Sequence, residues 1–278
     1  MNFQLFESSL YENELNKQRG FVPFQYGLTN LGNSCYANSV FQCLFGDAEL
    51  CNLVLDPANE LLYERPDNEL VKRFFQLMKS CFTNNEPLIK QEVSNVLEVV
   101  YNKSGLFQRG QQSDANEFLI YLLTSFKDSF DRCSALVYPG TTAHSTYLDE
   151  YQVGLKQTIV CEYGHLSERY DREMLSLNID GKRTLGDCLN DYFQEHIIER
   201  CICSSNGLLH NPNNNACNSF RCEKCKKNVG AQKLLEVTTL PKNLVIHLKR
   251  FRYNGRDVSE TLKLLIEQNE IFKLSFQT

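Results

Sequence analysis

One cysteine is predicted to lie where a helix begins, which makes it a candidate nucleophile. Residues 26–34 are rich in the turn-forming types Gly and Asn, and from residue 37 onward apolar residues recur at helical spacing. Asn33 or Ser34 is therefore predicted to cap the helix, with Cys35 at or just inside its N-terminus. The free N–H groups and the helix dipole there favour a thiolate, the nucleophilic form. The alternative interpretation is that Cys35 is a small buried hydrophobic residue.

A second group of cysteines has the spacing of metal ligands. Cys222 and Cys225 form a CxxC pair, in which two thiolates can bind one Zn²⁺ ion. One pair supplies only half of a tetrahedral site, so two further ligands are needed.

Composition excludes several classes of function. The chain has 278 residues, ordinary hydrophobic and charged contents of 42% and 23%, and a net charge of −5, which does not suggest a nucleic-acid partner. No signal peptide and no apolar run of about 18 residues is visible, so we expect no membrane association. Twelve cysteines without a secretion signal indicate a reducing compartment, and the expected location is cytoplasmic, nuclear or both.

The elements that would position these residues change type along the chain. Apolar stripes at helical spacing predict helices at Asn68–Phe82, at Gln91–Tyr101, and within Leu106–Phe130, where Ser113 or Asp114 is the cap. Strands are predicted at Leu155–Cys161, Glu168–Ile179, Lys233–Thr238 and 243–251, with a capped helix at Thr184–Phe193. The expected fold class is therefore α+β.

Three strings of the sequence resemble those of one enzyme family. The string GLTNLGNSCYANSVFQCL is similar to the cysteine box of the ubiquitin-specific proteases, which are papain-like deubiquitinating enzymes. The strings GQQSDANEFL and LPKNLVIHLKRF resemble the glutamine/aspartate box and a palm strand of the same family. The resemblance implies a helical thumb followed by antiparallel β fingers and palm.

The same resemblance implies a division of the chain. Residues 1–25 would be a partly disordered extension, and residues 26–278 would be the catalytic domain. Within that domain, residues 26–135 would form the thumb, 150–235 the fingers and first palm strands, and 236–278 an incomplete palm.

The resemblance also implies roles for individual residues. Cys35 would be the nucleophile that cleaves after the C-terminal glycine of ubiquitin, and Asn30 would donate a hydrogen bond to the oxyanion. Gln112 and Asp114 would line the channel for the ubiquitin tail, where a carboxylate suits the arginines of that tail. Ubiquitin and ubiquitinated proteins would be the partners, and the chemistry would require no cofactor.

In similar proteases two CxxC pairs at the tip of the fingers bind zinc. The upstream position here holds Cys161 and His165, and the second cysteine is missing. Cys161, His165, Cys222 and Cys225 could form a Cys₃His site for a structural zinc ion. The alternative is that the site has decayed and binds no metal.

The expected general base is the missing part of the pattern. In the family a histidine lies in a box well after the LKRF strand, whereas this sequence reaches Thr278 without such a box. Among the five histidines, His247 is assigned by the resemblance to a structural strand. We therefore expect poor turnover or none from this polypeptide. An inactive ubiquitin-binding scaffold or fragment, and a zinc-stabilised module without a link to ubiquitin, remain as alternatives.

Overall fold

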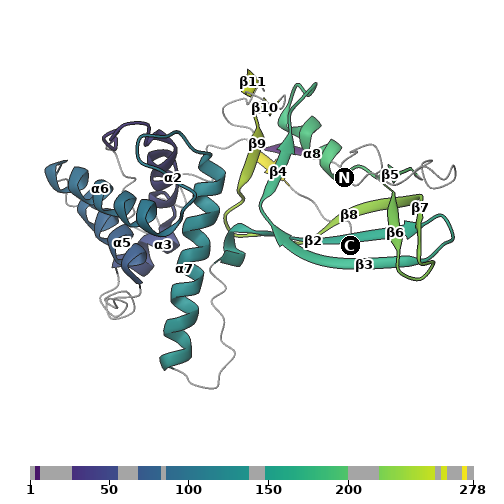
Figure 1. The fold of residues 1–278 in the computed structure, drawn as a ribbon, viewed down its shortest axis with the longest axis horizontal. Coiled ribbons are helices and arrows are strands. Elements are labelled where there is room, and N and C mark those ends of the chain that lie inside the picture. The colour runs from purple at the N-terminus through teal and green to yellow at the C-terminus, as the bar shows by residue number, and fades with distance from the viewer. Residues whose placement is uncertain are drawn as a thin grey trace. The chain divides into compact units, whose positions relative to one another are not determined.

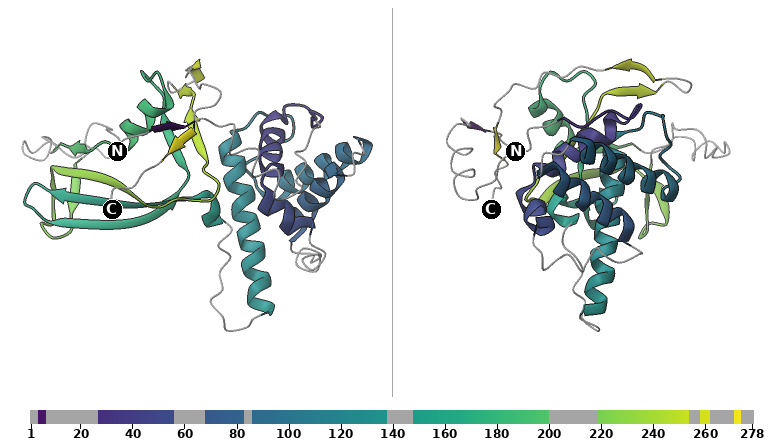
Figure 2. Two further views of the ribbon diagram at one scale, coloured as in Figure 1. Left: turned by 180° about the vertical axis from the view of Figure 1, so that it is seen from behind. Right: turned by 90° about the vertical axis from the view of Figure 1, so that its left-hand side faces the viewer.

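The computed structural model describes residues 4–6, 27–55, 68–82, 86–137, 148–199, 219–253, 258–261 and 271–273. The chain divides into two compact units, a helical unit of residues 9–148 and a β unit of residues 149–278 together with residues 1–8. Figures 1 and 2 show the elements of each unit. None of the helices in the described ranges is long and apolar enough to cross a membrane.

The helical unit contains five α-helices in the described residues. They are α2 (Cys35–Phe45), α3 (Ala48–Leu55), α5 (Glu69–Phe82), α6 (Glu86–Lys103) and α7 (Ala115–Val137). The predicted box helix and the helix at residues 68–82 are confirmed. The predicted helix at residues 91–101 is longer in the structure, because Glu86 and Pro87 form a first turn in which proline is well tolerated.

Aromatic side chains form the core of the helical unit. Phe41 on α2 and Phe118 on α7 are fully buried, and their rings meet edge to face at 5.6 Å. Phe118 also contacts Phe107 and Tyr36, with ring centroids 5.3 Å apart in both pairs. Such edge-to-face contacts add to the free energy of apolar burial. Phe118 therefore joins the first turn of α2 to the loop that precedes α7.

The β unit is built mainly on a four-stranded antiparallel sheet in the order β3-β2-β8-β5. Its strands are β2 (Val153–Cys161), β3 (Leu166–Glu173), β8 (Ala231–Thr239) and β5 (His196–Ile198). Outside this sheet lie the short helix η3 (Leu148–Tyr151) and the strands β4 (Leu175–Asn178), β6 (Phe220–Cys222), β7 (Lys227–Val229), β9 (Ile246–Lys249), β10 (Phe251–Tyr253) and β11 (Val258–Thr261). The predicted strands at residues 155–161 and 233–238 are confirmed.

One strand pair departs from the predicted antiparallel pattern. Strand β4 pairs with β9 in parallel, with Ser176 opposite His247. The predicted buried strand at residues 243–251 is shorter in the structure, and Ile246 and Leu248 are only partly buried. Helix α8 (Leu185–Phe193) is confirmed with its cap: the Thr184 hydroxyl accepts a hydrogen bond from the backbone N–H of Asp187.

Some predictions fall on residues outside the described ranges. Of the predicted extension at residues 1–25, only Gln4–Phe6 is described; it forms β1, which pairs with β12 (Ile271–Lys273). Two of the five histidines, His144 and His210, and the less regular C-x-C pair Cys201 and Cys203, considered as further metal ligands, lie outside the described residues.

Candidate functional site

The loop before Cys35 has the tight backbone that its glycine and asparagine residues predict. Gly32 and Asn33 adopt positive φ angles of 90° and 54°. Glycine carries no penalty in this region, and asparagine is one of the few other residues that enters it readily. The two residues reverse the chain so that helix α2 begins directly at Cys35.

Asn30 organises this loop through its side-chain oxygen. Its Oδ1 accepts hydrogen bonds from the backbone N–H groups of Gly32 and Ser34, both at 3.1 Å. The Ser34 hydroxyl donates to the same oxygen at 3.2 Å and accepts from the N–H of Leu31. Because backbone N–H groups can only donate, these contacts identify Oδ1 as the end of the amide that faces the loop. The NH₂ end is left as a donor for another acceptor.

The predicted position of Ser34 at the N-cap of α2 is confirmed, but its side chain acts differently from that of a capping residue. Ser34 occupies the N-cap position, but its side chain makes no capping hydrogen bond to α2. Its hydroxyl instead contributes to the Asn30 network. The serine hydroxyl therefore holds the loop in shape, a function that the sequence pattern did not reveal.

Cys35 is the first residue of α2, and it is exposed. The first N–H groups of an α-helix have no partner within the helix, so they can bind a negatively charged group. Here the first intrahelical bond runs from Asn38 N–H to the Ser34 carbonyl. The Cys35 thiol thus combines solvent access with a position that favours negative charge.

Two asparagine side chains connect the loop to its surroundings. The Asn38 Nδ2 group donates to the carbonyls of Leu28 and Thr29, both at 3.2 Å. The Asn33 Nδ2 group donates to the carbonyl of Gly110 at 2.7 Å. Neither contact was foreseen from the sequence, and the Asn33–Gly110 bond in particular joins residues 77 positions apart, so it leaves no local pattern. The second bond places the Cys35 loop beside the loop that holds Gln112.

Gln112 and Asp114 lie on that second loop and are exposed. Asp114 caps α7: its Oδ1 accepts from the backbone N–H groups of Asn116 and Glu117 at 2.7 and 3.0 Å. The prediction that Asp114 caps α7 is therefore confirmed. Its carboxylate remains at the surface, where it can also meet a cation.

Three histidines fall within the described residues, and all belong to the β unit. His247 Nδ1 is 2.9 Å from Ser176 Oγ, across the parallel pair of β4 and β9. His196 begins strand β5, opposite Lys233. His165 lies among the cysteines of the second candidate site.

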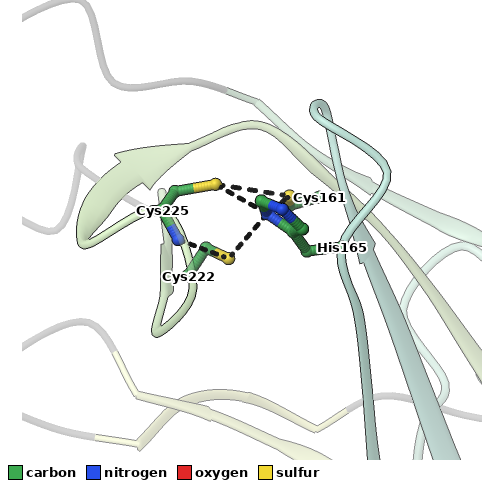
Figure 3. Close-up of side chains that lie close together, drawn as sticks. All are labelled: Cys161, His165, Cys222 and Cys225. Carbon is green, nitrogen blue, oxygen red and sulfur yellow. Dashed lines mark hydrogen bonds between the residues drawn. The ribbon is translucent and has the colours of Figure 1, made fainter.

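The four predicted metal ligands meet between two hairpins (Figure 3). Cys161 and His165 belong to the turn between β2 and β3, and Cys222 and Cys225 belong to the turn between β6 and β7. Their ligand atoms all lie within 4.8 Å of one another.

The spacing of these atoms resembles that of a tetrahedral zinc site. Metal–sulfur bonds of about 2.3 Å place two sulfur ligands about 3.8 Å apart. Cys161 Sγ and Cys225 Sγ are 3.8 Å apart, and His165 Nδ1 lies 3.7 and 3.8 Å from the Sγ atoms of Cys161 and Cys222. The 2.9 Å separation of His165 Nδ1 and Cys225 Sγ is a hydrogen-bond distance, and it would have to lengthen.

The two thiols of the CxxC pair differ in acidity. The backbone N–H of Cys225 points at Cys222 Sγ from 3.5 Å, and this contact lowers the pKa of the Cys222 thiol to about 6. Burial raises the pKa of the Cys225 thiol to about 12. Binding of a metal by both sulfurs would thus release a proton from Cys225.

Comparisons with known proteins agree on one family. A family model described as ubiquitin carboxyl-terminal hydrolase matches residues 26–277. Ubiquitin carboxyl-terminal hydrolase 25 of Arabidopsis thaliana is 29% identical over 266 residues, which cover 90% of this chain and 37% of that protein. The probable ubiquitin carboxyl-terminal hydrolase 16 of Schizosaccharomyces pombe is 27% identical over 87% of this chain and 50% of its own length. This chain therefore spans half or less of these two relatives.

A solved structure shows the same fold. The SAGA Ubp8/Sgf11/Sus1/Sgf73 DUB module bound to ubiquitin aldehyde matches with a TM-score of 0.66 and 18% sequence identity. The match covers 92% of this chain and 55% of the other chain. The α+β architecture of thumb, fingers and palm that the sequence predicted is thereby confirmed.

Proposed function

The chain belongs to the ubiquitin carboxyl-terminal hydrolase family, and from this we propose that it is a thiol-dependent deubiquitinase with Cys35 as its nucleophile. The substrate would be the bond that follows the C-terminal glycine of ubiquitin, and the partners would be ubiquitin and ubiquitinated proteins. The relatives' names and the ubiquitin aldehyde in the similar DUB module support this substrate.

The observation that carries the proposal is the hydrogen-bonded loop that holds Asn30 shortly before Cys35. The Cys35 thiolate attacks the carbonyl carbon of the terminal glycine, and the carbonyl electrons move to oxygen. The Asn30 NH₂ group, directed away from the loop by three hydrogen bonds to Oδ1, is suited to donate to that oxyanion. The C–N bond then breaks, the amine leaves with a proton, and water hydrolyses the thioester.

The leaving amine must receive a proton from an acid, and the attacking water must give a proton to a base; in such chemistry one imidazole usually does both in turn. His165 and His247 are already engaged with Cys225 and Ser176, and His196 belongs to strand β5. We expect full turnover to depend on an imidazole from outside the described residues. Attack by Cys35 on an electrophile needs only the thiolate, so it can be tested separately.

Gln112 and Asp114 are proposed to receive the ubiquitin tail. The Asn33–Gly110 hydrogen bond holds their loop against the Cys35 loop. Asp114 presents a surface carboxylate, which can form a charge-assisted hydrogen bond with an arginine.

The test is covalent labelling with ubiquitin whose C-terminus carries a thiol-reactive electrophile. We expect one adduct per chain, lost in Cys35→Ala and retained in Cys43→Ala. Cys43 is the matched control because it is a second exposed thiol on the same helix. If wild type gives no adduct but still binds ubiquitin in a pull-down, the chain is an inactive ubiquitin-binding scaffold.

We further propose that Cys161, His165, Cys222 and Cys225 hold a structural zinc ion. The convergence of three sulfurs and one ring nitrogen supports this, since zinc prefers such ligands in tetrahedral sites. The ion would join the β2–β3 turn to the β6–β7 turn and take no part in cleavage.

Zinc content can be measured by atomic spectroscopy on protein purified without added chelator. We expect one zinc per chain in wild type and much less in Cys225→Ser. Cys188→Ser is a suitable control, because Cys188 is a buried cysteine of the same unit outside the cluster. A metal-free wild type that is fully folded would refute the assignment.

We also propose a cytoplasmic or nuclear location. Twelve cysteines, four of them in one cluster with metal-ligand geometry, suit a reducing compartment. Fractionation of cells that express a tagged chain would test this, and secretion would contradict it.

A further inference from the structure

Strand β3 lies at one edge of the four-stranded sheet. Among the described residues it pairs with β2 alone, and seven of its eight side chains are exposed. Figure 1 shows it as the outermost strand of the sheet. An edge strand of this length carries a row of N–H and C=O groups that can pair with another strand. Proteins usually protect such edges with charged side chains, and β3 is indeed highly charged.

The charges of β3 are arranged symmetrically about its centre. The sequence from Ser167 to Glu173 is SERYDRE, in which Tyr170 is flanked by Arg169 and Asp171, and then by Glu168 and Arg172. Opposite charges thus stand at equal distances on either side of the tyrosine.

This symmetry allows β3 to pair with a second copy of itself. In a dimer with a twofold axis, two sheets can join edge to edge. The two edge strands then pair antiparallel, and paired residues point to the same face of the combined sheet. With Tyr170 opposite its own copy, Glu168 faces Arg172 of the second chain, and Arg169 faces Asp171. All four charged pairs across the interface are then attractive.

Neighbouring registers lack this property. A shift that centres the pairing on Glu168, Arg169, Asp171 or Arg172 places that residue opposite its own copy, so like charges meet. The register centred on Tyr170 avoids every such contact. Charge therefore favours the register centred on Tyr170. It disfavours the four nearest registers in which the side chains still point to the same face of the combined sheet.

The surroundings of β3 are compatible with this pairing. Tyr170 is 66% exposed and Leu166 is 50% exposed on the same face, so both would bury apolar surface against the second chain. Glu168 already contacts Lys156 on β2 at 2.7 Å, and in the pair it would lie between Lys156 and a second cation. Arg169 and Asp171 form an ion pair within the strand at 2.6 Å and would join the equivalent pair of the other copy.

We propose that this chain forms a twofold-symmetric dimer through antiparallel pairing of β3 with β3 of a second copy, in the register centred on Tyr170. The strand that pairs with the edge of β3 thus belongs to another molecule of the same chain. The two four-stranded sheets become one sheet of eight strands.

Sedimentation velocity over a range of protein concentrations tests the dimer. We expect wild type to shift from monomer to dimer as concentration rises. Glu168→Arg and Arg172→Glu should each weaken association roughly tenfold or more, because each change replaces two attractive cross-strand pairs with two repulsive ones. The double variant carrying both changes restores the attraction with reversed signs, and it should associate like wild type.

A matched control separates register-specific pairing from general charge effects. Glu236→Arg makes the same charge change on an exposed residue of the same sheet face, but on the inner strand β8. It should leave association unchanged. A monomeric wild type, a double variant no better than the single ones, or an equal loss in the control would each overturn the proposal.

Cysteine cross-linking tests the register and remains informative if charge variants fold poorly. Paired residues of antiparallel strands have Cα atoms about 4.5 to 5.5 Å apart, a span that a disulfide can bridge. We expect Tyr170→Cys to form an interchain disulfide on oxidation, above the background of wild type. Arg169→Cys alone should not, and a mixture of Arg169→Cys with Asp171→Cys should. Cross-linking of Arg169→Cys to itself would show a different register and refute the proposal.

Discussion

The side-chain amide of Asn30 has two ends with separate tasks. The oxygen end accepts three hydrogen bonds and holds the loop before Cys35. The nitrogen end is the proposed oxyanion donor. A substitution that keeps the oxygen and removes the nitrogen can therefore separate loop structure from catalysis.

Asn30→Asp is such a substitution. The carboxylate can still accept from Gly32 and Ser34, but it cannot donate to an oxyanion, and its charge repels one. We expect the variant to bind ubiquitin aldehyde at least about tenfold more weakly, since one oxyanion donor is worth about 3 kcal/mol in a transition state. The measurement is the inhibition or binding constant of the reversible adduct with Cys35.

Unmodified ubiquitin is the control ligand for Asn30→Asp, because it forms no adduct with Cys35. Its affinity for the variant should match its affinity for wild type. Unchanged aldehyde affinity would remove Asn30 from the proposed chemistry.

Asp114 also combines two roles that substitution can separate. Asp114→Asn keeps an oxygen acceptor for the N–H groups of Asn116 and Glu117 but removes the charge. We expect it to retain thermal stability and to bind ubiquitin more weakly. Asp114→Ala should lose binding and in addition about 1 kcal/mol of unfolding free energy, the usual value of an N-cap. Calorimetry and a ubiquitin titration measure the two effects, and equal ubiquitin affinity of wild type and Asp114→Asn would contradict the tail-binding role.

At the scale of elements, the sequence predicted best where the signal is local. The stripe of Leu70, Phe74, Leu77, Met78 and Cys81 predicted α5, and all five residues are buried. The Thr184 cap predicted the start of α8. Each of these signals lies within a few residues of the feature that it predicts, so tertiary contacts did not need to be known.

Helix α8 also allows a prediction about pH. The backbone N–H and hydroxyl of Thr184 lower the pKa of Asp187 below its ordinary value of 3.8, with a further contribution from the N–H of Arg183. A depressed folded-state pKa contributes stability that is present above the ordinary value and lost as pH falls through the folded one. We expect Asp187→Asn to flatten the decline of Tm between about pH 5 and pH 3. If Tm falls equally with pH in wild type and in Asp187→Asn over this range, protonation of Asp187 does not affect the stability of the fold.

Features that depend on distant segments were predicted less well. The direction of the β4–β9 pair was wrong, because strand pairing joins residues 71 positions apart and periodicity carries no information on direction. The Asn33–Gly110 bond was missed for the same reason. The convergence of Cys161 and His165 on Cys222 and Cys225 was anticipated for a different reason: the CxxC spacing indicated half of a metal site, and the family resemblance implied where the other half lies.

At the scale of the whole molecule, removal of the proposed zinc ion should affect the two units differently. All four proposed ligands belong to the β unit. We expect a chelator to increase hydrogen exchange in the β2–β3 and β6–β7 turns, while the helices α2, α5 and α7 keep their protection. Mass spectrometry of exchanged peptides measures this, with Cys225→Ser as a reference for the metal-free state. A uniform rise in exchange across both units would instead indicate global unfolding.

A metal bound by the cluster at the two turns would also restrict the unfolded chain. Cys161 and Cys225 are 64 positions apart, so a metal that joins them closes a long loop of polypeptide. The entropic cost of closing a loop grows only with the logarithm of its length, and a doubling costs about 0.6 kcal/mol. A flexible segment as long as the loop itself, inserted at the exposed Gly181 turn, should thus leave the metal bound. The length of chain between the two ligand pairs should therefore have little effect on metal binding.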